Sequence, residues 1–184
     1  MRIVLAGLLG AIVMFVWSSI AHMATPLAYT GISKISNEKL VLDSFKQAIG
    51  KKPGLYFFPW TDPTDPKYME KGIERAKTEP SGFIVYTPPG SMDMTPLMLG
   101  EFAKEVLQCV IAAFLLSLTA LATFAARAGF VGLIGVFTAL GTDTSYWIWY
   151  GFPLSYTLAV IAMPLIGLLL ASLVIAFMVR PRAA

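Results

Sequence analysis

The chain has few of the residues that most often carry chemistry. Its 184 residues include one cysteine, Cys109, and one histidine, His22, and charged residues make up only 14% of the sequence, against about 25% in soluble domains. A single cysteine excludes an intramolecular disulfide. The sequence also lacks a phosphate-binding loop, a dinucleotide fingerprint, zinc-ligand spacing and a pair of catalytic carboxylates. We therefore predict no catalytic residue, no resident cofactor and no enzyme activity.

Apolar residues are abundant instead. They make up 57% of the chain, and the mean hydropathy is +0.70. A helix needs about 20 apolar residues to cross a hydrocarbon core of ~30 Å. Four stretches meet this need: 3–20, 106–126, 128–150 and 154–179. We expect an α-helical membrane protein in contact with the lipid bilayer, with one transmembrane helix in residues 1–21 and three in residues 105–184.

The arginines outside the long central segment predict the topology. Of the 14 lysines and arginines, those outside residues 22–104 are Arg2, Arg127, Arg180 and Arg182. With four membrane crossings, these arginines all fall on one side, which the positive-inside rule identifies as the cytoplasm. Both termini are then cytoplasmic, and residues 22–104 lie on the opposite side of the membrane.

The first apolar stretch has a second interpretation. Arg2, the apolar run and the small residues of Ser19-Ile20-Ala21 could together form a cleaved signal peptide. The run is longer than the ~7–15 apolar residues of such a peptide. This length favours a retained transmembrane helix.

Residues 22–104 are predicted to form a small α/β domain between the first two spans. Acidic and basic residues nearly balance there, so the net charge of +3 reflects the four arginines and does not indicate nucleic-acid binding. Turn residues separate a helix that starts at Ser36-Asn37, a strand at 55–58, a helix at 66–78 and a strand at 83–86. A strand, a helix and a strand in this order predict a βαβ unit with a right-handed crossover.

The next helix leads from this domain into the membrane. Thr95-Pro96 is a typical helix start. The first turns then carry Glu101, Lys104 and Glu105, which we expect above the bilayer, before the apolar stretch begins.

Three strings of the sequence resemble a family of small bacterial inner-membrane proteins that has no known activity. The strings are WSSIAHMATPL, GLYFFPW and SGFIVYTPPG. The resemblance implies a bacterial inner membrane and a periplasmic location for residues 22–104. It implies no catalytic residue.

Among the polar residues inside the predicted spans, five are candidate site residues: Ser18, Ser19, Thr142, Asp143 and Ser145. Asp143 is the most unusual of them, because an unpaired carboxylate near the edge of the hydrocarbon costs a few kcal/mol. It could form a proton or cation site. It could also be a helix-end acid that is hydrogen-bonded to a neighbouring hydroxyl, or a residue just above the membrane.

A soft metal site is a further hypothesis. Its residues would be His22, Met23, Met92, Met94 and Met98. Thioethers and an imidazole in an oxidising compartment suit Cu(I). Methionines also pack flexibly at irregular surfaces, so the cluster has a purely structural explanation as well.

These observations favour a non-enzymatic accessory, assembly or scaffold subunit. It would bind a membrane-protein partner, or a second copy of itself, through the domain at 22–104 and through helix faces rich in small residues. Those residues are Gly7, Gly10, Ala11, Ala128, Gly132 and Gly135. The alternative is a protein that binds copper, a lipid or a quinone where the domain meets the helices, near His22, Met94 and Asp143.

Overall fold

The computed structural model describes residues 1–90 and 93–180. The chain forms two compact units. The first, here called the helical unit, comprises residues 1–32 and 93–184, and the second, here called the insert, comprises residues 33–92. A mostly helical chain with a small α/β insert after the first helix was predicted, and the structure confirms it.

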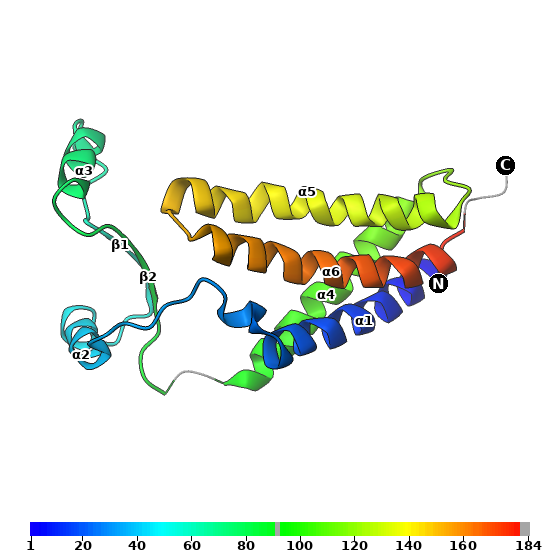
Figure 1. Ribbon diagram of the computed structural model, residues 1–184, viewed down its shortest axis with the longest axis horizontal. Helices are drawn as coiled ribbons and strands as arrows, with labels where there is room; N and C mark the ends of the chain where they lie inside the picture. Colours follow the sequence, from blue (N-terminus) through cyan, green and yellow to red (C-terminus); the bar gives the residue numbers. More distant parts are fainter. Residues whose placement is uncertain (91–92, 181–184) are drawn as a thin grey trace. The chain divides into compact units, whose positions relative to one another are not determined.

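The helical unit contains four long helices and one short 3-10 helix. They are α1 (Arg2–Ala24), η1 (Pro26–Tyr29), α4 (Met94–Ser117), α5 (Phe124–Tyr150) and α6 (Leu154–Met178). The central helix is α1, which packs against both α4 and α6, while α5 packs mainly against α6. Figure 1 shows α5 and α6 side by side.

Three of these helices have the length and apolar composition of membrane spans, namely α1, α5 and α6. The remaining long helix is α4, which contains the first part of the predicted second span. Its first half carries Glu101, Lys104 and Glu105. Because of these three charged residues, α4 does not have the composition of an ordinary lipid-exposed helix. The chain is thus a multi-pass membrane protein with three candidate spans among its described residues.

The predicted second span, 106–126, is wrong as a single helix. α4 ends at Ser117, and α5 begins at Phe124. Thr123 caps α5, because its hydroxyl accepts a hydrogen bond from the backbone N–H of Ala126 at 3.2 Å. The continuous apolar run hides this helix start, so hydropathy alone places the boundary too late.

Arg127 consequently lies in the first turn of α5 and not between two helices. Its guanidinium donates to the carbonyl of Ala122 at 2.6 Å and to that of Ala176 at 2.9 Å. These bonds tie the start of α5 to the end of α6.

Small residues let the backbones of α1, α4 and α6 approach closely. A Cβ atom placed on Gly7 would lie 2.7 Å from the Cα of Val110, and one on Gly10 would lie 3.1 Å from the side chain of Ile175. On α6, Gly167 faces Met14 and Trp17 of α1, and the Trp17 indole donates to the Met163 carbonyl at 2.8 Å. The buried core follows this seam: Ala6, Ala11, Met14, Cys109, Ala112, Ala113, Leu168, Ala171 and Ile175.

The insert contains two helices and two strands. They are α2 (Glu38–Ala48), β1 (Gly54–Phe58), α3 (Tyr68–Ala76) and β2 (Gly82–Tyr86). α2 starts where the sequence predicts, because the Asn37 side chain accepts from the Leu40 N–H at 3.3 Å. The predicted order of strand, helix and strand is confirmed.

The predicted right-handed crossover between the strands is wrong, because β1 and β2 are antiparallel. Phe58, the last residue of β1, pairs with Gly82, the first residue of β2. The connection that contains α3 therefore leaves and returns at the same end of the sheet. A parallel crossover would require α3 to run along the sheet, and α3 does not pack closely on either strand.

We predict that Gly7→Ala weakens the helical unit. The added methyl group meets backbone atoms of Val110 on α4, so the two helices must separate, which costs about 1–3 kcal/mol. Gly129→Ala on α5 is the matched control, since a Cβ atom there meets nothing within 4 Å. Thermal unfolding in detergent, followed by circular dichroism, measures both. Equal midpoints for the two variants would contradict the close approach of α1 and α4.

Candidate functional site

The insert leaves most of its apolar side chains uncovered. Among its described residues, only Pro59 and Tyr86 are buried. On α3, Met69 and Ile73 are 61% and 60% exposed, and on α2 Leu40 is 60% exposed. Both helices are amphipathic, yet neither approaches another described helix or strand closely. The sheet adds further exposed apolar residues: Leu55, Phe57 and Val85.

The polar face of α3 is well ordered by its own contacts. Arg75 donates to both carboxylate oxygens of Glu79, at 2.9 and 2.6 Å, and to the carbonyl of Trp60 at 2.7 Å. The hydrogen bonds from Arg75 hold the pKa of Glu79 below its usual value. Lys71 of α3 forms an ion pair with Asp65, which precedes the helix in the sequence. The insert therefore has defined helices whose apolar faces are not covered by the other described residues of the insert.

A cavity of about 480 Å³ lies between the end of α1 and the start of α4. Its walls combine apolar and polar side chains: Phe15, Ser18, Ser19, His22, Met23, Met94, Leu97, Met98 and Glu101. The structure thus places four of the five predicted copper-site residues around one cavity, while Met92 lies outside the described residues. Copper binding stays a prediction. In the described part of the chain, no three His, Cys, Asp or Glu residues are grouped for a metal ion.

The polar groups of this cavity have defined partners. The His22 ring nitrogen Nδ1 lies 2.8 Å from the Ser18 carbonyl, and the Ser19 hydroxyl donates to the Phe15 carbonyl at 2.9 Å. Glu101 accepts from Lys104 at 2.6 Å. These contacts determine which lone pairs of the lining residues can still accept a hydrogen bond from a ligand.

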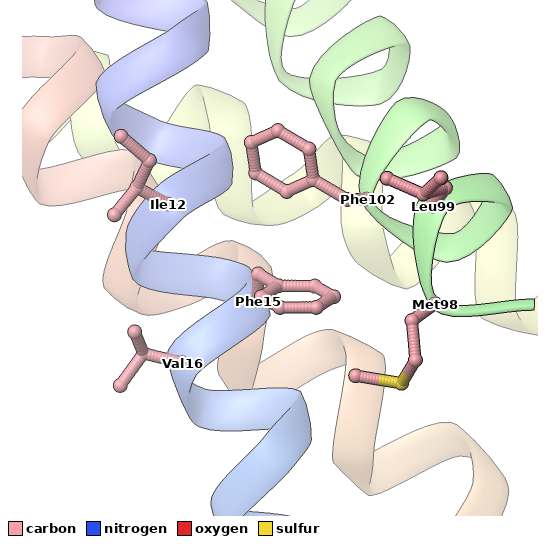
Figure 2. A pocket seen from close by; sticks show the side chains of 6 residues that line it. All are labelled: Ile12, Phe15, Val16, Met98, Leu99 and Phe102. Carbon is pink, nitrogen blue, oxygen red and sulfur yellow. The ribbon is translucent and has the colours of Figure 1, made fainter. Parts of the chain in front are cut away.

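A second cavity, of about 320 Å³, adjoins the first and shares Phe15 and Met98 with it. Its lining is entirely apolar and also includes Ile12, Val16, Leu99 and Phe102. Figure 2 shows the Phe15 ring and the Met98 side chain in the space between α1 and α4. Phe15 and Phe102 meet edge to face, with ring centroids 5.3 Å apart.

Glu105 is completely buried between α4 and α1. Its expected position above the bilayer stays a prediction, and its burial against another helix was not predicted. One carboxyl oxygen accepts from the Ser18 hydroxyl at 2.7 Å, and the other has no hydrogen-bond partner among the described residues. Helical periodicity could have revealed this, because Glu105, Cys109 and Ala112 share one face of α4.

Asp143 lies in a different place from His22. It is half-buried in α5 and lines a small cavity of about 40 Å³ with Gln108, Thr138 and Pro164. Its neighbours Thr142 and Ser145 are exposed. A single ligand site near His22, Met94 and Asp143 is therefore not formed, since Asp143 lines a separate cavity from the other two residues.

Comparisons were made with protein-family models, with curated proteins and with solved structures, and none of them finds a match. The class of the protein therefore rests on its own three long apolar helices, which make it a multi-pass membrane protein. The resemblance to small bacterial inner-membrane proteins stays a prediction.

We predict that Ser18→Ala destabilises the helical unit by about 1–3 kcal/mol. The variant removes the one hydrogen bond that the buried Glu105 receives. Ser117→Ala is the control, because the Ser117 hydroxyl bonds only to a carbonyl of its own helix, and a shift within about 0.5 kcal/mol is expected there. Denaturant titration in detergent measures both variants. An Ser18→Ala protein as stable as the Ser117→Ala protein would show that the buried bond does not stabilise the unit.

Proposed function

We propose that the protein is a non-enzymatic membrane subunit whose insert binds a partner protein. The uncovered apolar faces of α2, α3 and the sheet support this proposal. A domain of about 60 residues normally buries about 60% of the surface of its unfolded chain, and a two-stranded sheet alone is marginally stable. The insert therefore needs a complementary surface to bury these side chains.

The spacing of the exposed residues suits recognition of a helix in a groove. Met69 and Ile73 are four positions apart on α3, so they project from one face of the helix. An amphipathic helix of this kind places its apolar residues in a hydrophobic groove of the partner. A second copy of this chain is the alternative occupant, and the experiment below separates the two.

The small-residue helix faces are weaker candidates for the partner contact. Gly7 and Gly10 face Val110 and Ile175, and Gly132 and Gly135 face Leu169 and Leu168. These residues are thus occupied by packing within the helical unit. The outward faces of the long helices carry large apolar side chains that suit lipid: Leu8, Ile12, Leu107, Phe114, Leu133 and Phe177.

We further propose that α4 is a fourth span. It packs antiparallel along α1, as the pairs Gly7–Val110 and Ser18–Glu105 require. Burial of Glu105 against α1 removes this charge from the lipid. The antiparallel order then places Arg2, Arg127 and Arg180 at one end of the helical unit. The positive-inside rule makes that end cytoplasmic and the insert extracytoplasmic, and the resemblance to small bacterial inner-membrane proteins implies that the insert is periplasmic.

A pair of double variants tests partner binding. Met69→Gln with Ile73→Gln removes the apolar face of α3. The control is Glu70→Gln with Glu74→Gln, which also introduces two glutamines but on the polar side of the same helix. Each protein is purified in a gentle detergent from its native membrane, and co-purified proteins are quantified by mass spectrometry. We expect a partner with the unchanged chain and with the control, and at least a tenfold loss with the apolar-face variant, because apolar anchors dominate such contacts.

Two results would contradict this proposal. One is recovery of every version as a bare monomer. The other is equal recovery of the same partner with both double variants. Co-purification of two differently tagged copies of this chain, lost in the apolar-face variant, would identify a second copy as the partner.

A further inference from the structure

The polar groups that line the cavity between α1 and α4 have already used their hydrogen-bond donors. The Ser18 hydroxyl donates to Glu105, and the Ser19 hydroxyl donates to the Phe15 carbonyl. A carbonyl can only accept, so the His22 ring donates from Nδ1 to Ser18, and in the neutral form of the ring Nε2 is left as an acceptor. Glu101 is a carboxylate and accepts only.

The cavity therefore presents acceptors to whatever enters it. Ser18, Ser19, His22 and Glu101, which carry two hydroxyl oxygens, one imidazole and one carboxylate, line the same space. A headgroup made only of carbonyl or phosphate oxygens finds no donor among them. A primary ammonium group has three N–H donors and a positive charge, and it fits both the lone pairs and the carboxylate of Glu101.

The apolar part of the site continues from the polar part. The adjoining cavity of about 320 Å³ shares Phe15 and Met98 with the first and is lined by carbon and sulfur side chains alone. Polar groups lie toward the α1 end at His22, and apolar groups lie deeper, toward Ile12 and Phe102. This gradient follows the long axis of α1, a candidate membrane span. A polar head with an apolar chain matches it.

The size of the space suits an organic ligand. Ligand pockets usually measure about 300–1,000 Å³, and the first cavity measures about 480 Å³. A copper ion held by imidazole and thioether groups would need these side chains to converge on one point. The observed cavity is as large as a small organic molecule.

We propose that the groove formed by these two cavities binds a membrane amphiphile with a primary ammonium headgroup and an apolar chain. The head lies among Ser19, His22 and Glu101, and the chain lies along Phe15, Met98 and Phe102. Lys104 already forms an ion pair with Glu101, so the charge of this carboxylate is partly balanced. The groove therefore selects a headgroup by its N–H donors more than by its net charge.

Two lipids that differ only at the head nitrogen test this proposal. Phosphatidylethanolamine has an ammonium with three N–H donors, and phosphatidylcholine has the same charges with none. The full chain in detergent is offered equal amounts of both, and native mass spectrometry measures the bound lipid. We expect one tightly bound phosphatidylethanolamine, preferred by about tenfold or more, which is the ratio for one charge-assisted hydrogen bond.

Variants of the groove supply the controls. His22→Leu with Glu101→Leu removes acceptors from exposed or half-exposed positions, and the preference should fall to about unity. Met98→Trp fills the apolar part, and both lipids should then be lost together. Glu70→Leu, on α3 of the insert, leaves the groove unchanged and should keep the full preference.

Three results would overturn the proposal. Equal binding of the two lipids by the unchanged chain would indicate ordinary bilayer contact. A preference that survives in His22→Leu with Glu101→Leu would place the ammonium elsewhere. Stoichiometric Cu(I) uptake that is lost in Met94→Leu, without any lipid preference, would identify the same residues as a metal site.

Discussion

The close packing of α1 against α4 and α6 is the constraint on which the helical unit depends. Glycine at positions 7 and 10 brings two different helices to the backbone of α1. Trp17 then bonds to α6, and Ser18 bonds to Glu105 of α4. Because α4 makes only small contacts with α5 and α6, removal of α1 would leave α4 without its main partner and would leave α6 packed on α5 alone.

The same packing explains how α4 tolerates three charged residues. Glu101 and Lys104 pair with each other near the start of the helix, and Glu105 is enclosed by α1. None of the three needs to face lipid alone. The groove between α1 and α4 begins at this point, and one of the three charged residues, Glu101, lines the polar end of the proposed ligand site. The insert is a separate compact unit. Its helices expose apolar side chains, and we propose that these contact a protein partner.

Much of the architecture follows from hydropathy and caps. The positions of α1, α5 and α6, the start of α2 at Asn37 and the order of elements in the insert were all predictable. The two large errors have physical causes. Thr123 starts a helix inside an uninterrupted apolar run, so composition could not place it. The antiparallel pairing of β1 and β2 depends on where the connection returns, which local propensity does not determine.

The candidate sites were only partly predictable. Grouping of His22 with Met94 and Met98 follows from the antiparallel packing of α1 and α4, and the sequence suggested it only because these side chains are soft metal ligands. The sequence could not show that Asp143 lies apart from that group, because this depends on which helices pack beside Asp143. The burial of Glu105 against α1 was not predicted, because glutamate side chains are rarely fully buried.

The number of membrane crossings tests the account most directly. In a Cys109→Ala background, single cysteines at Lys51, Ala120 and Phe152 are exposed in intact cells to a maleimide that cannot cross the membrane. If α4 crosses beside α1, Lys51→Cys and Phe152→Cys are labelled from outside, and Ala120→Cys is labelled only after the membrane is permeabilised. Labelling of Ala120→Cys from the same side as Lys51→Cys would show that α4 does not cross, and it would contradict the antiparallel pairing of α1 and α4 within the membrane.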